Sequence, residues 1–234
     1  MDFRIGAGIF DAFPEAKIGV LVVKGLDNSD GSAAIAGFLR VAEETARKGL
    51  SVEALAAHPR IDDWRRAYRK FGSDPKTYKN SLEALLRRVL KGGTLPSINP
   101  LVDAYNAVSI KHLFPAGGSD LDLVEGDITL TFANGGEQFV PLGNANAESV
   151  LPGEVVYKDD ASVLCRRWNW RESEKSKMTD ATRNVCLVLE GLESSTRREL
   201  SYALAELASL LCANCGGTAR ASVLDGEKMA MEIP

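Results

Sequence analysis

The spacing of the hydrophobic residues changes along this chain of 234 residues, and that change restricts the fold more than any other feature. Between Ile35 and Leu113, apolar side chains recur every three or four positions, the spacing of amphipathic helices. From Ile128 onwards they alternate with polar ones, which is typical of half-buried strands. Helical spacing returns from Leu200 to Leu211. The order helices, strands, helix predicts an α+β fold rather than a regular βαβ array.

The individual elements follow from the same patterns. The sequence predicts a buried strand at residues 17–26, helices around 35–46, 61–71, 82–90 and 99–113, and strands at 128–132, 138–142, 155–158, 162–166 and 185–190. Asn134-Gly-Gly136 predicts a hairpin turn between two of those strands. Asn99-Pro100 is a typical helix start, and Ser194 or Ser195 is expected to cap the last helix.

The chain contains no repeat, low-complexity tail or clear linker, so we expect a single compact domain of residues 1–234. In that domain, helices pack on an antiparallel or mixed sheet. We expect residues 1–80 to form an N-terminal strand with helices packed on it, residues 81–190 the core, and residues 191–234 a C-terminal helix and strand.

Composition excludes several classes of protein. With 28 Lys and Arg against 32 Asp and Glu, the net charge is −4, which argues against tight, non-specific binding of nucleic acid. The longest apolar run, residues 18–23, is too short to span a membrane, and Met1-Asp-Phe-Arg4 does not resemble a signal peptide. Four cysteines do not make a disulfide framework. A cytoplasmic protein without a membrane partner is therefore expected.

Motifs for common catalytic chemistries are missing from the sequence. Cys212 and Cys215 form a single CxxC that follows a helix, whereas zinc sites need a second pair and redox motifs precede a helix. His58 and His112 are the only histidines, which disfavours a Ser-His-Asp or Cys-His site. No phosphate-binding glycine loop is present. We therefore expect no metal and no cofactor.

Two polar segments call for a functional explanation. Asp103 and Asn106 share one face of the helix that begins at Asn99, with Tyr105 beside them. They form either a ligand-binding wall or a solvated helix face. Residues 164–172 interleave Trp168 and a second tryptophan with three arginines, which suits stacking on bases and pairing with phosphates. The alternative is a strand edge with paired arginines and core tryptophans.

These segments carry a resemblance to a known family. The sequence matches in spacing, without gaps, at Asn99-Pro-Leu-Val-Asp103, Asn106, Pro115, Asp120, Glu125-Gly126 and Ile128. The string resembles the editing domain of bacterial phenylalanyl-tRNA synthetase β chains. The likeness continues more loosely through Pro141-Leu-Gly143, Val155-Val156 and the Arg- and Trp-rich residues 164–172. The chain is even more similar to freestanding single-domain members of the family.

The resemblance implies an aminoacyl-tRNA deacylase. Such domains hydrolyse the ester that joins a wrong amino acid to the 3′-terminal adenosine of a tRNA, as a second sieve. The site implied is a cleft between helix and sheet that positions water and uses neither a metal nor a covalent nucleophile. The expected partner is the aminoacylated 3′ end of a tRNA.

Site residues follow residue by residue from the resemblance. The family's threonine-asparagine pair falls on Tyr105 and Asn106, and Asn106 is expected to orient the ester or the ribose. Its histidine falls on Gly117, where a Gly117-Gly118 turn would offer N–H groups to an oxyanion. Its specificity glutamate falls near Glu172. The neighbouring side chains Arg166, Arg167, Trp168 and Arg171 are expected to contact tRNA.

The substrate is left open between two interpretations. If Asp103, Asp120, Glu125 and Glu172 face one pocket, they would suit a cationic amino acid such as an arginine analogue. If Asp120 and Glu125 instead cap a turn and pair with lysines, the reason to expect a cationic substrate disappears. A tyrosine-type substrate also remains possible. The rival functions are a non-catalytic tRNA- or protein-binding module and a small-molecule hydrolase without an RNA partner.

Overall fold

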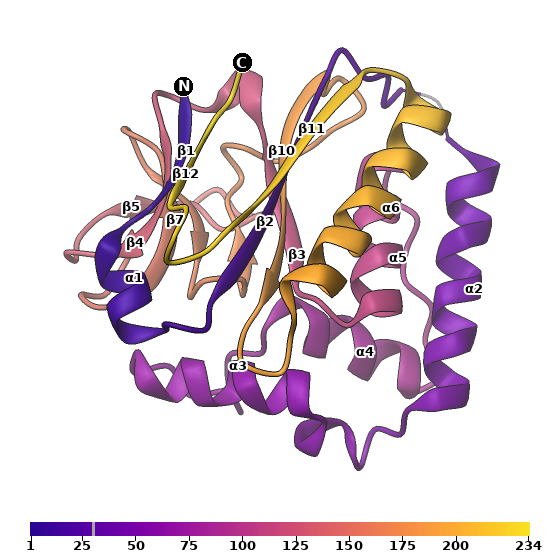
Figure 1. Cartoon of the computed structure of the whole chain (residues 1–234), viewed down its shortest axis with the longest axis horizontal. Coiled ribbons are helices and arrows are strands. Elements are labelled where there is room, and N and C mark those ends of the chain that lie inside the picture. Colours follow the sequence, from indigo (N-terminus) through magenta and orange to yellow (C-terminus); the bar gives the residue numbers. More distant parts are fainter. Residues whose placement is uncertain (30) are drawn as a thin grey trace.

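The computed structural model describes residues 1–29 and 31–234, and it has an α+β architecture (Figure 1). The helices are α1 (Ala7–Ala12), α2 (Ala33–Gly49), α3 (Pro59–Lys70), α4 (Ser81–Leu90), α5 (Pro100–His112) and α6 (Arg197–Cys215), with short 3₁₀ helices at Leu55–Ala57 and Leu121–Leu123. The strands are β1 (Asp2–Ile5), β2 (Lys17–Lys24), β3 (Ala116–Asp120), β4 (Ile128–Phe132), β5 (Gln138–Phe139), β6 (Glu148–Ser149), β7 (Val155–Lys158), β8 (Val163–Arg166), β9 (Arg171–Glu172), β10 (Asn184–Gly191), β11 (Thr218–Leu224) and β12 (Ala230–Glu232).

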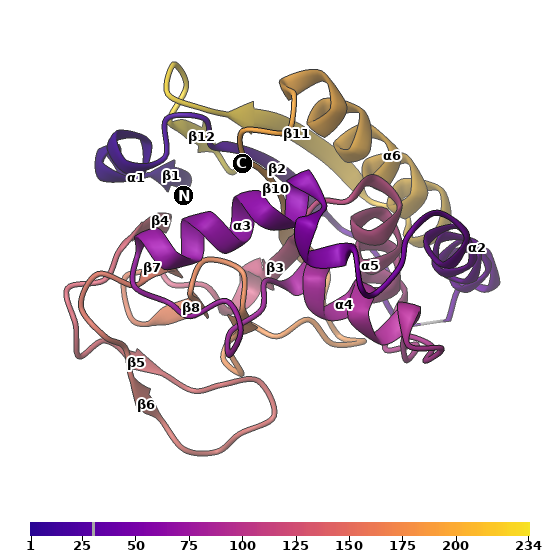
Figure 2. The ribbon, with the colours of Figure 1, turned by 90° about the horizontal axis from the view of Figure 1, so that it is seen from below.

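Two larger sheets organise the molecule. An antiparallel sheet has the strand order β11-β2-β10-β3, so β3 is an edge strand. A six-stranded sheet has the order β12-β1-β4-β7-β8-β9, in which only β1 and β4 run parallel among the described pairs. The small β5–β6 sheet projects from the body (Figure 2). Because β1 pairs with β12, the two chain ends lie side by side (Figure 1).

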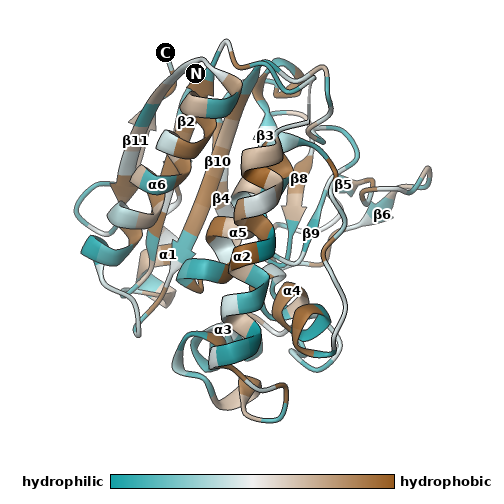
Figure 3. Ribbon diagram, turned by 90° about the vertical axis from the view of Figure 1, so that its right-hand side faces the viewer, coloured by the Kyte–Doolittle hydropathy of each residue, from teal (hydrophilic) through white to brown (hydrophobic). Residues whose placement is uncertain are grey.

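The four-stranded sheet is covered on both faces, which explains why β2 is a continuous apolar run rather than an alternating one. Leu21 and Val23 point to one side, where they pack with α5 and α6. Val20 and Val22 point to the other, where they join a core with α3 and the six-stranded sheet. Figure 3 shows the apolar strand β2 behind the layer formed by helices α5 and α6. The sheet is therefore the central layer of a single compact domain.

Most expected elements are confirmed, including the helices around residues 35–46, 61–71, 82–90 and 99–113. The cap of the last helix is corrected from Ser194 or Ser195 to Thr196. The side chain of Thr196 accepts a hydrogen bond from the Glu199 N–H, and the Glu199 carboxylate accepts one from the Thr196 N–H. This reciprocal capping box satisfies two N–H groups at once, so it determines where the helix starts.

The prediction of a hairpin turn at Asn134-Gly-Gly136 is wrong. Strand β4 pairs with β1 and β7, and β5 pairs with β6. The carboxylate of Glu137 accepts the N–H groups of Asn134 and Gly135, which closes a local turn without joining the two strands. The three-part division of the chain at residues 80 and 190 stays a prediction.

Candidate active site

Helix α5 carries the first group of expected site residues, and its start is strongly specified. The side chain of Asn99 accepts a hydrogen bond from the Val102 N–H at 3.0 Å, and Pro100 occupies the first turn. Asp103 is 2% exposed and accepts hydrogen bonds from the Ile98 N–H and the Ser97 hydroxyl. Asp103 therefore holds the loop that enters α5, and it does not line the cleft described below. Its role in substrate binding stays a prediction.

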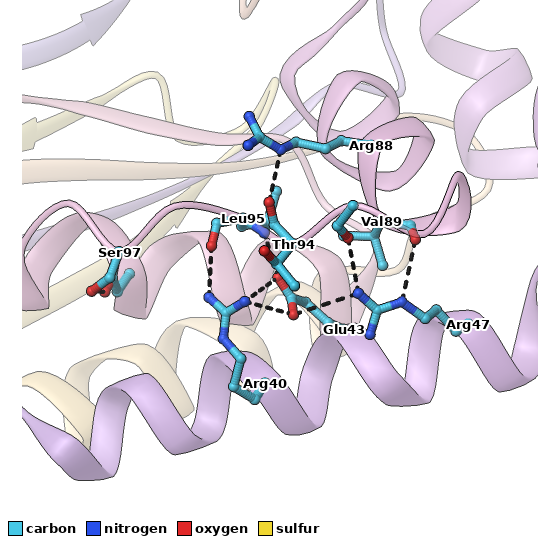
Figure 4. A network of polar contacts seen from close by, with 10 residues as sticks. Arg40, Glu43, Arg47, Arg88, Val89, Thr94, Leu95 and Ser97 are labelled. Atoms are coloured by element: carbon cyan, nitrogen blue, oxygen red, sulfur yellow. Dashed lines mark hydrogen bonds and ion pairs between the residues drawn. The ribbon is translucent and has the colours of Figure 1, made fainter.

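The segment that leads to α5 is anchored by a buried carboxylate on α2 (Figure 4). Glu43 is 1% exposed, pairs with Arg40 at 2.8 Å and accepts a hydrogen bond from the Leu95 N–H. Arg40 also donates to the Leu95 carbonyl at 2.7 Å, and Arg88 of α4 donates to the Thr94 carbonyl. These contacts hold the connection between α4 and α5 against α2, which orients the site helix.

A cleft opens between α4, α5, β3 and β9, with a cavity of about 220 Å³. It is lined by Ser81, Ala84, Leu85, Tyr105, Asn106, Ala116, Asn169, Trp170, Arg171 and Glu172. Four residues selected from the sequence, Tyr105, Asn106, Arg171 and Glu172, therefore come together although they belong to two distant segments. Asn106 is half-buried and lines the cleft, and none of the side-chain hydrogen bonds formed within residues 1–29 and 31–234 involves its amide.

Glu172 closes the inner end of this cleft, because its carboxyl group lies against the backbone of β3. The Gly118 N–H donates a hydrogen bond to this carboxyl group, and the thiol of Cys165 contacts it. Burial, reinforced by the charge of Glu190, raises the pKa of Glu172 to about 8. Glu172 is therefore mostly protonated at neutral pH, which makes it a polar but uncharged group.

The two glycines of β3 do not form the expected turn. Gly117 and Gly118 lie in strand β3 opposite Val188 and Leu187 of β10. As β3 is an edge strand, alternate N–H groups point away from β10, and Gly118 uses that freedom to bind Glu172. The expectation of a glycine turn with free oxyanion donors is therefore corrected: the Gly118 N–H is already occupied.

The two other expected carboxylates serve the fold. Asp120 is 6% exposed, accepts a hydrogen bond from the Thr182 hydroxyl at 2.6 Å and caps the short helix after β3. Glu125 is exposed and pairs with Lys175 at 2.8 Å. Asp120 therefore caps a turn and Glu125 pairs with a lysine, as the second interpretation of the sequence expected. Neither carboxylate lines the cleft, so their assignment to a substrate pocket is corrected.

Three of the four expected tRNA contacts are also buried, so that assignment is corrected for them. Arg166 is 4% exposed and pairs with Glu154 at 2.6 Å and with Glu148 at 2.9 Å. Arg167 pairs with Glu154 and stacks over the Tyr78 ring. Trp168 is fully buried in the core. Arg171 is exposed at the cleft and donates to the Leu142 carbonyl.

Residues beyond the expected site residues also line the cleft or lie behind it. Trp170, the second tryptophan that the sequence suggested for stacking, forms part of the wall, with its ring edge-to-face on Tyr78. Glu190 lies behind Glu172, and its signal in the sequence was a carboxylate at the end of the otherwise apolar run of β10. Asn169 connects the cleft with Glu190, since it lines the cleft and its side-chain nitrogen donates a hydrogen bond to Glu190 at 2.6 Å.

Fold and site together define an α+β domain with a ligand-sized cleft between a helical layer and a sheet edge. The chain belongs to the B3/4 domain family, whose model matches residues 63–214. The matched segment contains Asn99 to Ile128, and the match confirms the resemblance to domains of the phenylalanyl-tRNA synthetase β chain.

One similar solved structure is described as the crystal structure of an N-terminal fragment of the phenylalanyl-tRNA synthetase β subunit from Pyrococcus horikoshii. It is 15% identical, aligns with a TM-score of 0.47, and covers 92% of this chain. The chain spans about half of that fragment, since the alignment covers 49% of it. No curated protein matches the chain.

The described part of the chain contains neither a metal-ligand cluster nor a membrane-spanning helix. Within residues 1–29 and 31–234, no three His, Cys, Asp or Glu side chains gather as metal ligands do. No helix in those ranges has the length and apolar character needed to cross a membrane.

Proposed function

We propose that this protein is an aminoacyl-tRNA deacylase, which hydrolyses the ester between an amino acid and the 3′-terminal adenosine of a tRNA. The observation that carries the proposal is the cleft, where an unpartnered amide (Asn106), an exposed guanidinium (Arg171) and an indole (Trp170) face one cavity. Membership of the B3/4 family supports the same reaction class.

Each of these groups suits one part of the substrate. The indole of Trp170 offers an edge or face to the terminal adenine, a contact that is worth about 1–3 kcal/mol per base. Arg171 can pair with a backbone phosphate. Arg88 is exposed on α4 one turn beyond Ala84, a residue of the cleft wall, so a second cation lies on the same helix face.

Asn106 is the group best suited to the ester itself. Its amide can donate a hydrogen bond to the carbonyl oxygen or to the ribose hydroxyl, and nothing in the described structure competes for it. A donor aimed at the developing oxyanion lowers the barrier, because it stabilises charge that appears only in the transition state.

The surroundings of the cleft support an uncharged amino acid rather than a cationic one. Asp103, Asp120 and Glu125 are engaged in capping or ion pairs. Glu172 remains, and its pKa of about 8 leaves it mostly protonated at neutral pH. The protonated form of Glu172 gives a guanidinium no counter-charge, which favours a substrate with an uncharged amino-acid side chain.

The proposal is tested by incubating the protein with a panel of tRNAs that carry cognate or near-cognate amino acids. Loss of the ester is followed against the spontaneous rate, and acceleration on at least one member is expected. Asn106→Ala should lower kcat by about tenfold or more. Asn146→Ala, which changes an exposed amide before β6, is the matched control and should retain full activity.

If the whole panel is left at the spontaneous rate, the deacylase proposal is wrong. Retained tRNA binding in that case would support the rival function, a non-catalytic tRNA-binding module. An unchanged rate in Asn106→Ala would remove Asn106 from the reacting centre.

A further inference from the structure

A second cavity of about 20 Å³ lies behind the cleft, between the two larger sheets. This volume is enough for about one water molecule. Its polar lining consists of Ser119, Cys165, Asn169, Glu172, Cys186 and Glu190 together with the hydroxyl of Tyr157. Among the described residues that line it there is no Lys, Arg or His. Two carboxyl groups therefore share a small interior space without a counter-cation.

Glu190 lines this cavity from β10. It is fully buried on β10, receives a hydrogen bond from the Tyr157 hydroxyl on β7, and receives another from the Asn169 side-chain nitrogen at 2.6 Å. Asn169 in turn accepts a hydrogen bond from the Tyr68 hydroxyl on α3 at 2.9 Å. These neutral donors hold the Glu190 carboxyl in one orientation. Burial raises its pKa to about 7.

Glu172 connects this interior space with the cleft. Glu172 and Asn169 are the two residues that line both cavities. On the cleft side Glu172 faces Tyr105 of α5, whose pKa is raised by burial and by the charge of Glu172. Arg171 lines the same cleft. On the interior side it faces Glu190 and Cys186 of β10 and Cys165 of β8. Its carboxyl is thus able to pass a proton between substrate and interior.

We propose that Glu172 is the proton acceptor for the hydrolytic water, and that Glu190 is a positioning residue that acts on it across the interior cavity. This inference rests on the proposed deacylase function. As the water oxygen bonds to the acyl carbon, its proton moves to the Glu172 carboxylate. The bond between the acyl carbon and the ribose oxygen then breaks, and the carboxyl returns the proton to that oxygen. The products are the free amino acid and the tRNA 3′ end with its hydroxyl restored.

The environment of Glu172 suits this role. General bases work best when their pKa lies near the working pH, and burial together with the Glu190 charge brings Glu172 to about 8. Glu190, with a pKa of about 7, loses its proton in the same range, so the two groups titrate as a pair. The charge on Glu190 therefore controls the pH at which Glu172 becomes an effective base.

The test uses the intact protein and a tRNA that it deacylates, with rates measured between pH 5.5 and 8.5 and corrected for spontaneous hydrolysis. Glu172→Gln keeps the size and polarity of the side chain and should lower kcat by about 100-fold or more, the usual worth of a general base. In the unaltered protein, kcat/KM should rise with pH and reach half of its maximum near pH 8.

Glu190→Gln distinguishes positioning from mere structural support. It removes the charge that faces Glu172, so the rise in kcat/KM should move to lower pH. Carbon NMR of the ligand-free protein should show that the Glu172 carboxyl also titrates at lower pH. Glu193→Gln changes an exposed glutamate just beyond β10 and should leave both curves unchanged.

A folded Glu172→Gln protein that retains the full rate and pH profile would overturn the assignment of Glu172 while leaving the deacylase function intact. A Glu190→Gln protein with a lower rate but an unmoved profile would reduce Glu190 to a structural residue and overturn its positioning role. If no tRNA is deacylated by the unaltered protein, the proposed function itself fails, and the base assignment fails with it. The NMR titration would then still report whether the two carboxyls are coupled.

Discussion

Glu172 and Gly117 are packed so closely that a Cβ atom on Gly117 would lie 2.2 Å from the Glu172 Oε1 atom. The carboxyl of Glu172 thus occupies the space where any other side chain at position 117 would begin. Gly118 allows a second close approach, since a Cβ there would lie 2.4 Å from the Cys186 carbonyl oxygen. The two glycines are required by the packing of Glu172 and β10 rather than by a turn.

Gly117→Ala is expected to displace the Glu172 carboxyl from β3. Because the contact at 2.2 Å involves the far end of a side chain, Glu172 can move away, and the fold should survive. Deacylation should fall by about tenfold or more, as a base displaced from its reacting position loses its contribution. Rate and thermal melting are measured together. Gly136→Ala, at a surface turn with a positive φ, should instead reduce stability without an effect specific to catalysis.

Arg171→Ala is expected to weaken tRNA binding. Loss of one phosphate contact should raise KM and reduce the slope of log K against log salt by about one, with little change in kcat. The salt series is measured in parallel for Arg198→Ala, an exposed arginine of α6, which does not line the cleft. Equal slopes for all three proteins would show that Arg171 lies outside the tRNA interface.

Glu154→Gln is expected to destabilise the protein strongly. Glu154 is 4% exposed and pairs with both Arg166 and Arg167, so the substitution leaves buried guanidinium charge with less compensation. Breaking one side of a buried ion pair costs about 3 kcal/mol or more. Urea unfolding measures the change in the free energy of unfolding. Glu15→Gln, which changes an exposed partner of Lys17, should alter it by less than about 1 kcal/mol.

Glu172 and Glu190 should make a contribution to the stability of the protein that decreases as the pH rises from about 4.5 to about 8. In the unfolded chain their carboxyls ionise near their ordinary pKa of 4.5, whereas in the folded protein they keep protons up to about 8 and about 7. At these two groups the folded state therefore binds more protons in that window, so their contribution to the free energy of unfolding falls with rising pH.

Glu172→Gln should flatten this dependence, as the side chain can no longer take up a proton on folding. Urea unfolding at a series of pH values measures the slope. The matched variant Glu193→Gln should retain it, since Glu193 is exposed. A slope unchanged by Glu172→Gln would mean that this carboxyl ionises normally in the folded protein.

Patterns of local sequence predicted the secondary structure well where periodicity was long and caps were specific. The helix that starts at Asn99-Pro100 was predictable because the residues at a helix start determine its capping hydrogen bonds. The strand β2 was predictable because a continuous apolar run indicates burial on both faces. The pairing of β4 with β1 and β7 was not, since partners far apart in the chain decide it.

The candidate site divides in the same way. The ungapped motif spacing pointed to Asn106, and a looser alignment with the same family pointed to Glu172; both line the cleft. Composition could not separate Arg171, which is exposed, from Arg166, which is buried against Glu154. These two arginines have the same chemistry and lie in the same short segment, so only their positions on β8 and β9 distinguish them.

The sequence by itself determined the α+β class, the helix that carries Asn106 and membership of an editing-domain-like family, because these depend on local periodicity and motif spacing. The tertiary structure alone decided which charged groups are free to meet a substrate. Asp103, Asp120 and Arg166 satisfy partners from distant segments, while Glu172 is brought against Gly118 and opposite Glu190. The properties of an ionisable group depend on its neighbours in space, and the fold supplies those neighbours.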